Sequence, residues 1–200
     1  MDKTSHRLII AITGASGVRY GVRLLELLKP LEIETHLVLS RTAEVTLACE
    51  TELKIAQVQA LADRWYPATD LAAAISSGSF RTMGMIIAPC SVRSMSEIAT
   101  GVTTSLVTRA ADVVLKERRR LVLMVRETPL HTGHLRTMTQ LSEMGAIIAP
   151  PVPAFYAKPT SLDAMVDHTL GRVLDLFDLD AGSVTRWGEG PRPARAKRKD

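Results

Sequence analysis

Residues 7–28 read RLIIAITGASGVRYGVRLLELL, an apolar run followed by a glycine-containing turn and a segment with helical spacing. The run is short and almost free of polar residues, which is typical of a strand buried on both faces of a parallel sheet. After the turn, Val18, Leu24, Leu25 and Leu28 recur at the spacing of one helix face. The stretch therefore predicts a strand, a turn and a helix.

The same alternation continues along the chain. Apolar runs that predict buried strands cover Arg7–Thr13, Glu34–Ser40, Gly84–Pro89, Leu121–Arg126 and Ala146–Ala149. Helical spacing appears between them, in Ala43–Leu47, around Ile98, in Leu106–Val114 and in Leu135–Leu141. A last helix is predicted after a cap at Thr160 or Ser161, with an apolar stripe from Leu162 to Phe177. Strands that alternate with helices predict an α/β fold with a doubly wound parallel sheet.

Length and charge predict one folded domain over residues 1–190 and a short tail. The 200 residues are 46% hydrophobic and 23% charged, which excludes a disordered or fibrous protein. The net charge of +4 is concentrated after Pro191, where five cations face one anion, so residues 1–190 are formally neutral. A formally neutral body does not favour binding to nucleic acid. Residues 191–200 are expected to be a basic, disordered tail.

Membrane insertion and secretion are both disfavoured. The longest apolar stretches, Leu8–Ile12 and Met85–Ala88, are much shorter than the roughly 20 residues that cross a bilayer. Met1–His6 lacks a secretory layout, and the two cysteines, Cys49 and Cys90, form no CxxC motif. We therefore expect a cytoplasmic protein without disulfide bonds, zinc or a membrane partner.

Polar turns follow each predicted strand. The carboxyl ends of parallel strands share one edge of the sheet, where ligands of such folds bind. Five segments are predicted at this edge: Thr13–Gly17, Ser40, Pro89–Ser91, Arg126–Pro129 and Pro150–Pro153.

Two of these turns suit a phosphate. Thr13–Gly17 enters a helix, whose first amides attract anions, although a purely structural turn has the same pattern. It departs from GxGxxG, and the second strand ends in Ser40 and not in an acidic residue, so a mononucleotide is favoured over NAD. In Pro89–Ser94, the proline is expected to stop the strand and Ser91 to cap the next helix. Cys90 is interpreted as a buried thiol and not as a nucleophile.

Other polar residues leave two interpretations open. Arg126 and Glu127 end a buried strand, where they either bind a ligand or pair with each other. His131 and His134 have the spacing of a metal pair but lack a third ligand, so hydrogen bonding at a helix start is favoured. The stiff loop around Tyr156 either walls a site or packs on the surface.

Taken together, the motifs resemble the flavin prenyltransferases of the UbiX type, including the small B subunits of phenolic-acid decarboxylase systems. The resemblance covers nearly the whole body and rests on several long motifs in the same order. These motifs are TGASG (13–17), SSGSF (76–80), APCS (88–91), TRAADVVLKER (108–118), LVLMVRETPL (121–130), PPVPAFY (150–156), MVDH and GRVLD (165–175), and RWG (186–188).

The resemblance implies a flavodoxin-like, Rossmann-type subunit that binds FMN between protomers of a homododecamer or another trimer-based assembly. It also implies transfer of a dimethylallyl group from dimethylallyl phosphate to N5 and C6 of reduced FMN, without a metal. The product, prenylated FMN, is the cofactor of a UbiD-type decarboxylase that acts on aromatic acids.

The family's motifs also imply roles for individual residues. Contacts to FMN are expected from Gly14, Ala15, Ser16, Ser40, Ser91, Val92, Arg93, Ser94 and Arg126. Dimethylallyl phosphate is expected to be held by Arg109, Lys116, Tyr156 and Arg172. Catalytic roles fall on Ser16, Glu50, Lys116, Glu127 and Trp187. Cations would neutralise the departing phosphate, Ser16 and Glu127 would relay a proton, and Trp187 would stabilise an allylic cation.

The sequence departs from the family pattern near the expected flavin edge. Thr103–Ser105 stands where relatives commonly have Asp-Asn or Asp-Gly, and Arg93 stands where they commonly have lysine. Two other functions remain open: a flavin-carrying subunit without catalysis, and a flavin-dependent decarboxylase of the cysteine-decarboxylase type. The second is disfavoured because residues 7–35 contain no histidine.

Overall fold

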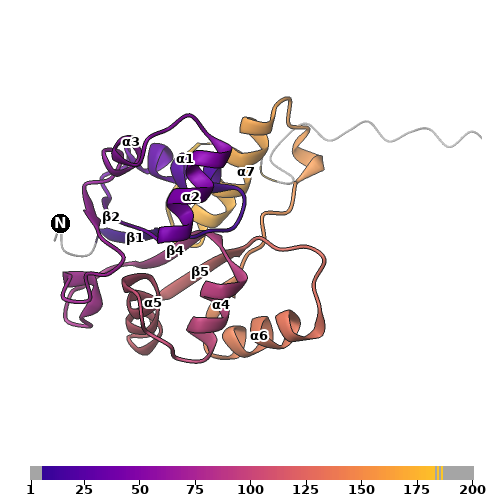
Figure 1. Ribbon diagram of the computed structural model, residues 1–200. Helices are drawn as coiled ribbons and strands as arrows, with labels where there is room; N and C mark the ends of the chain where they lie inside the picture. The colour runs from indigo at the N-terminus through magenta and orange to yellow at the C-terminus, as the bar shows by residue number, and fades with distance from the viewer. Residues whose placement is uncertain (1–5, 183, 185, 187–200) are drawn as a thin grey trace, which may run out of the picture. The chain divides into compact units, whose positions relative to one another are not determined.

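The computed structural model describes residues 6–182, 184 and 186, which form parts of two compact units, Met1–Val152 and Pro153–Asp200 (Figure 1). The first unit contains β1 (Arg7–Ile12), α1 (Val18–Leu28), β2 (Glu34–Leu39), α2 (Arg41–Glu50), α3 (Ile55–Gln59), β3 (Arg64–Tyr66), η2 (Ala74–Ser76), β4 (Gly84–Cys90), α4 (Val92–Ala99), α5 (Leu106–Lys116), β5 (Arg120–Val125), α6 (Thr132–Glu143) and β6 (Ala146–Ile148). The second contains η3 (Phe155–Ala157) and α7 (Leu162–Asp175).

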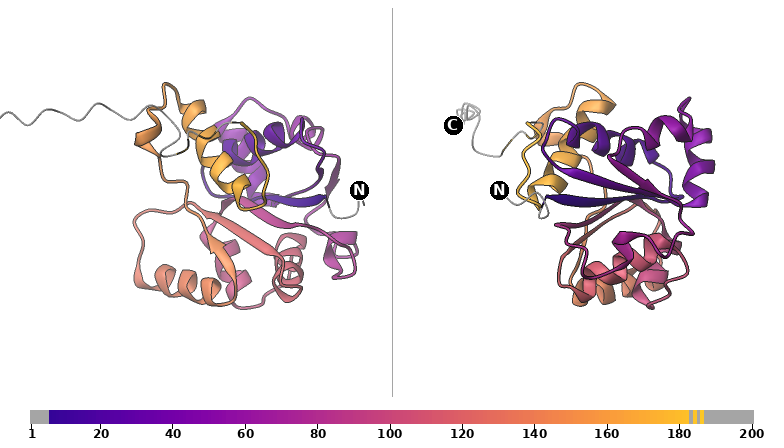
Figure 2. Two further views of the ribbon diagram at one scale, coloured as in Figure 1. Left: turned by 180° about the vertical axis from the view of Figure 1, so that it is seen from behind. Right: turned by 90° about the vertical axis from the view of Figure 1, so that its left-hand side faces the viewer.

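The strands of the first unit form one parallel sheet in the order β3-β2-β1-β4-β5-β6. Helices α1 and α2 lie on one face of this sheet, and α4, α5 and α6 lie on the other (Figures 1 and 2). The predicted doubly wound α/β fold is therefore confirmed. The five predicted strands are all present, and their ends differ from the prediction by at most one residue.

The strand order reverses between β1 and β4. From β1 the chain moves outward to β2 and β3, and it then returns to β4 on the other side of β1. All seven residues of β4 are buried, as are Leu8–Ile12 of β1, so the middle of the sheet is the core of this unit. In doubly wound sheets, ligands bind at the carboxyl ends of the strands where the order reverses. This topology makes the turns after β1 and β4 the expected place for a ligand.

Serine side chains fix where several helices begin. Ser40, Ser91, Ser105 and Ser161 each accept a hydrogen bond from the backbone N–H three residues later. The predicted cap at Ser91 is thus confirmed, and Ser161 rather than Thr160 caps α7. Ser105, one of the departures from the family pattern, has a local structural role as the cap of α5.

The strands differ from the prediction at two points. The short strand β3 was not predicted, because Arg64 and Trp65 are exposed and give no apolar run. Pro89 was expected to stop its strand, but β4 continues through it to Cys90. The pairing register with β5 shifts between Ile87 and Cys90, and proline, which has no N–H to donate, is tolerated at such irregularities.

No helix in the described part of the chain is both long and apolar enough to cross a membrane. Trp187, the predicted boundary after residue 190 and the basic tail 191–200 lie outside the described residues. The roles predicted for them stay predictions.

Candidate functional site

The turn after β1 is shaped by close contacts that favour glycine. Gly17 has a φ of 97°, in the left-handed region that side chains disfavour. A Cβ atom on Gly14 would lie 2.4 Å from the side chain of Thr42 at the start of α2. Thr46, one turn further along α2, donates a hydrogen bond from Oγ1 to the Gly14 carbonyl at 3.3 Å. The turn is therefore held closely against α2.

Glu50, the last residue of α2, caps the neighbouring helix α1. Its carboxylate accepts hydrogen bonds from the N–H groups of Gly17, at 2.9 and 3.0 Å, and of Val18, at 3.0 Å. Gly17 has no side chain with which to cap α1 itself. Two amides that could bind a phosphate at this helix start are thus already bonded to a carboxylate of the same chain.

The structure brings the predicted catalytic residues Ser16 and Glu50 together. Partial burial favours a higher pKa for Glu50, but hydrogen bonds from the Ser16 side chain and from the Gly17 and Val18 amides outweigh it, and the positive charge of Arg126 adds to them. The net result is a pKa below the ordinary value. Glu50 is therefore a stable anion that can accept a hydrogen bond from the Ser16 hydroxyl.

The turn after β4 offers a second polar helix start. Ser91 Oγ accepts a hydrogen bond from the Ser94 amide at 3.2 Å and donates one to Ser94 Oγ at 3.1 Å. The first amides of a helix, here those of Val92 and Arg93, have no acceptor within the helix and are available to an anion. The Arg93 guanidinium is largely exposed and pairs with Glu97 at 2.8 Å.

Arg126 and Glu127 directly follow β5. The Arg126 amide donates to the Cys90 carbonyl at 3.2 Å, which places this segment beside the end of β4. Both side chains are exposed, and Glu127 accepts a hydrogen bond from the Thr128 amide at 2.9 Å. Within the described residues these two side chains form no ion pair with each other, so the expected alternative of a structural pair is not found.

Lys116 lies at the opposite edge of the sheet. It ends α5, just before the first residue of β5, and pairs with Glu117 beside Gly78. The starts of parallel strands share the edge opposite Arg126, and the six residues of β5 separate the two edges by roughly 20 Å. A single copy of the chain therefore does not place Lys116 next to Arg126. Arg109, also on α5, pairs with Asp112 at 2.8 Å.

In the second unit, Tyr156 and Arg172 both have local partners. The Tyr156 hydroxyl lies 3.5 Å from Nε2 of His168, and the two rings meet edge to face. Arg172 and Arg186 both hydrogen-bond to Asp175. These bonds and charges, led by Arg186, lower the pKa of Asp175 against the opposing effect of its burial.

Two interpretations of reactive side chains are confirmed. Cys90 is fully buried, and burial raises the pKa of its thiol to about 12, as expected for a packing residue. His131 caps α6, since its Nδ1 accepts hydrogen bonds from the amides of Gly133 and His134. In the part of the chain that the structure describes, no group of three or more potential ligand residues could hold a metal.

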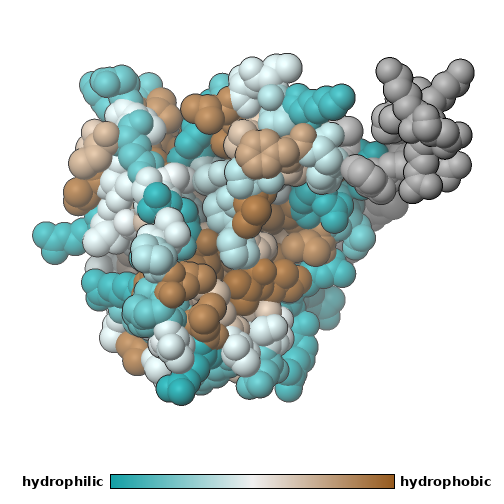
Figure 3. All heavy atoms as spheres, turned by 90° about the vertical axis from the view of Figure 1, so that its right-hand side faces the viewer, coloured by the Kyte–Doolittle hydropathy of each residue, from teal (hydrophilic) through white to brown (hydrophobic). Residues whose placement is uncertain are grey.

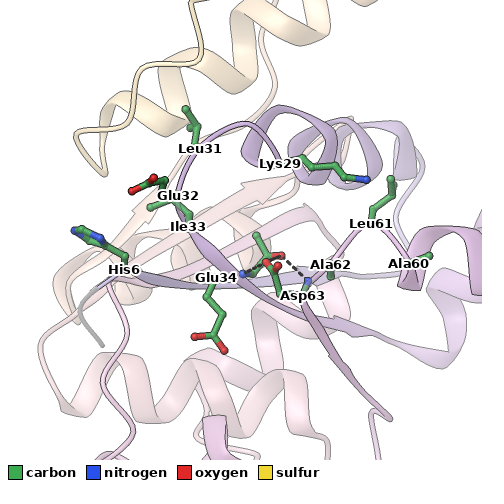
Figure 4. Close-up of a pocket in the computed structure, with 11 residues that line it drawn as sticks. His6, Lys29, Leu31, Glu32, Ile33, Glu34, Ala60, Leu61, Ala62 and Asp63 are labelled. Atoms are coloured by element: carbon green, nitrogen blue, oxygen red, sulfur yellow. Dashed lines mark hydrogen bonds between the residues drawn. The ribbon is translucent and has the colours of Figure 1, made fainter. Parts of the chain in front are cut away.

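A hollow of about 630 Å³ lies away from this site, at the amino edge near the starts of β1 and β2 (Figure 4). Its lining includes Lys29, Glu32 and Glu34, and Asp63 there is engaged by the amide and hydroxyl of Thr35. None of the predicted site residues lines it. The polar turns at the carboxyl edge fit the sequence motifs better than this hollow does.

Comparison with known proteins identifies the family. The family model described as Flavoprotein matches residues 1–179. The flavin prenyltransferase UbiX of Escherichia coli K12 is 60% identical over 184 residues, which cover 90% of this chain and 97% of the relative. The chain belongs to the UbiX flavin prenyltransferase family.

Two solved structures of UbiX-type proteins extend the comparison. One is AnUbiX (PadA1) in complex with FMN and dimethylallyl pyrophosphate, with a TM-score of 0.91 and 49% identity, covering 94% of this chain and 100% of that one. The other is a dodecameric FMN-dependent UbiX-like decarboxylase from Escherichia coli O157:H7, with a TM-score of 0.89 and 49% identity, covering 90% and 98%. The resemblance inferred from the sequence motifs is therefore confirmed.

Sequence reasoning placed Thr13 in the turn after the first strand but missed its contacts across the sheet. Thr13 bridges the ends of β1 and β4 through its buried hydroxyl. Its position after an apolar run and before a glycine marks a turn, but the partners of its hydroxyl come from a segment far away in the sequence. No local signal reveals them.

Proposed function

We propose that this chain transfers the dimethylallyl group of dimethylallyl phosphate to N5 and C6 of reduced FMN. The carbon–oxygen bond of the donor breaks, phosphate leaves with the bonding electron pair, and N5 bonds to that carbon and loses its proton. The remaining double bond of the dimethylallyl group then takes up a proton, and the resulting tertiary cation bonds to C6, which loses its proton. The reduced flavin supplies the nucleophilic atoms. The protein's part is to orient both substrates, exclude water and move protons.

The observation that carries the proposal is the pairing of Ser16 with Glu50 beside Arg126. A hydroxyl bonded to a stable carboxylate is oriented to pass a proton, and the nearby cation suits an anionic substrate. The open amides of Val92 and Arg93 and the hydroxyl of Ser40 are positioned to bind the flavin's phosphate and polar edge. Glu127, which is exposed and lies directly after β5, is proposed to protonate the leaving phosphate.

We further propose that the complete site is shared between copies of the chain. Lys116 lies at the far edge of its own sheet, so it can reach a carboxyl-edge site only on a neighbouring copy. Exposed apolar side chains after β5 and along α6, including Leu130 and Leu135, suit burial in such an assembly. Figure 3 shows one face of the molecule on which hydrophobic residues gather. The dodecameric relative supports a homododecamer or another trimer-based assembly.

The proposal includes a partner and a location. Prenylated FMN would pass to a UbiD-type decarboxylase, and we expect both proteins in the cytoplasm, without a nucleic-acid or membrane partner. Tyr156 and Arg172 are proposed to hold dimethylallyl phosphate, and Trp187 to stabilise its cation. The relative with bound dimethylallyl pyrophosphate supports a prenyl phosphate as the donor.

Variants separate this function from its alternatives. Lys116→Ala should still bind FMN but form no prenylated flavin when supplied anaerobically with reduced FMN and dimethylallyl phosphate. Normal turnover by this variant would refute the role of Lys116. A carrier subunit would support its decarboxylase equally well after Glu127→Gln, whereas a prenyltransferase would not. A decarboxylase would release carbon dioxide from its substrate without any prenyl donor.

A further inference from the structure

Thr13 joins the two central strands at the carboxyl edge of the sheet. It directly follows β1 and is fully buried. Its Oγ1 donates a hydrogen bond to the Pro89 carbonyl at 2.7 Å and accepts one from the Ser91 amide at 2.8 Å. Its own amide also donates to the Pro89 carbonyl, at 3.2 Å. The hydroxyl therefore both donates a hydrogen bond to, and accepts one from, the short segment at the end of β4.

This bridge lies between the two turns predicted to contact the flavin. Gly14–Ser16 begins at the residue after Thr13, and Ser91–Ser94 begins at the residue whose amide Thr13 holds. The adjoining Cys90 carbonyl accepts from the Arg126 amide, so the third predicted contact is tied to the same strand end. One buried hydroxyl thus sets the separation between segments that a single ligand would have to span.

We propose that Thr13 is a positioning residue that fixes the spacing of the two flavin-binding turns. The identity of the ligand as FMN rests on the proposed function. Valine has nearly the same shape as threonine, but it would leave the Ser91 amide, which donates to the fully buried Thr13 side chain, without its acceptor. An amide that faces an apolar methyl group in place of its acceptor is unfavourable, so the turn after β4 would shift to find another partner. Because FMN must contact both turns, the shift weakens its binding.

Thr35 provides a matched control at the opposite edge of the sheet. It is also buried, and its Oγ1 makes the same pair of bonds, donating to the Asp63 carboxylate at 2.8 Å and accepting from the Asp63 amide at 3.0 Å (Figure 4). Thr35→Val removes an equivalent hydroxyl bridge without touching the predicted flavin turns. A general loss of stability would affect both valine variants, whereas loss of positioning would affect only Thr13→Val.

The experiment measures the dissociation constant of FMN for the full chain by flavin fluorescence, together with thermal unfolding, for the wild type, Thr13→Val, Thr13→Ser and Thr35→Val. We expect Thr13→Val to raise the dissociation constant about 10-fold or more. Thr13→Ser, which keeps the hydroxyl, should stay within about 3-fold of the wild type. Thr35→Val should lower the unfolding temperature but leave FMN affinity unchanged. In turnover, Thr13→Val should raise the KM for reduced FMN more than it lowers kcat.

Other outcomes overturn the inference. Wild-type affinity in Thr13→Val would show that the hydroxyl does not position the turns. Equal losses in Thr35→Val, or no recovery in Thr13→Ser, would assign the effect to stability or to the methyl group. If the wild type binds FMN but forms no prenylated flavin, the proposed function fails while the affinity comparison still decides the role of Thr13. A wild type that does not bind FMN would overturn both.

Discussion

Glu50 closes the amino end of a helix to which it does not belong, because its carboxylate accepts the Gly17 amide at 2.9 and 3.0 Å. The same carboxylate is hydrogen-bonded by the Ser16 side chain. One group thus stabilises the turn after β1 and orients the hydroxyl proposed to move a proton. Structural and chemical roles meet in a single side chain, and substitutions there should affect stability and turnover together.

Glu50→Gln should show this dual role in its pH dependence. The pKa of Glu50 in the folded state lies below its ordinary value of 4.5, so its contribution to stability is complete above that value and is lost as the pH falls through the folded pKa. Between about pH 6 and about pH 3, the wild type should therefore lose more stability than Glu50→Gln.

Urea unfolding of both proteins across this range measures the difference. Parallel losses of stability would show that the carboxylate has an unperturbed pKa. At neutral pH, Glu50→Gln should also form prenylated flavin roughly 100-fold more slowly, since the glutamine cannot hold a negative charge beside Ser16.

Gly21→Ala should destabilise the fold. A Cβ atom at Gly21 would lie 2.3 Å from the Ala88 carbonyl oxygen and 2.6 Å from Ile12, so α1 would have to move away from β1 and β4. Overpacking of this kind costs about 1–3 kcal/mol or more, measured as the free energy of unfolding in urea. Glu26→Ala on the same helix removes only a surface pair with Arg23 and should cost less than about 1 kcal/mol. Equal effects of the two substitutions would contradict the close approach of α1.

The two cysteines should differ sharply in reactivity. Cys49 is exposed, whereas Cys90 is buried with a thiol pKa of about 12, so little of it is thiolate at neutral pH. A thiol reagent should modify one cysteine rapidly in the native protein and both after unfolding. Cys90→Ala should retain prenyl transfer at high flavin concentration. Rapid modification of two thiols in the native state, or loss of turnover in Cys90→Ala, would give Cys90 a chemical role.

Local signals in the sequence predicted most of the fold but only part of the site. The five predicted strands are apolar runs, and Ser91 and His131 have the residue types that cap helices, so these features follow from neighbouring residues. Strand β3 was not predicted, because Arg64 and Trp65 are exposed and its place at the sheet edge depends on pairing with β2. The bonds of Glu50 to Gly17 and of Thr13 to Ser91 join distant segments, and no periodicity reveals such contacts.

The position of Lys116 at the amino edge of the sheet could have been predicted from the sequence. A residue just before a parallel strand lies at the amino edge of the sheet, and Arg126, just after the same strand, lies at the carboxyl edge. The family motifs placed both residues in one site. They did not show that the two residues lie at opposite edges of the sheet within one chain. The separation follows from the positions of the two residues before and after β5. This separation leads to the proposed sharing of the site between copies.

Complementation between inactive variants should reveal the shared site. Ser16→Ala and Lys116→Ala should each form little prenylated flavin alone. When the two are co-expressed and purified as mixed assemblies, some sites combine an intact Ser16 from one copy with an intact Lys116 from another, so activity should recover in part. Absence of recovery in assemblies shown by mass spectrometry to contain both chains would refute the sharing of sites.

The central claim, prenyl transfer to flavin, is tested most directly by anaerobic incubation of the purified wild-type protein with reduced FMN and dimethylallyl phosphate, followed by mass spectrometry of the extracted flavin. The account predicts a flavin heavier by one five-carbon prenyl unit, formed only when protein and donor are both present. Recovery of FMN with unchanged mass, under conditions in which the Escherichia coli relative forms the product, would contradict it.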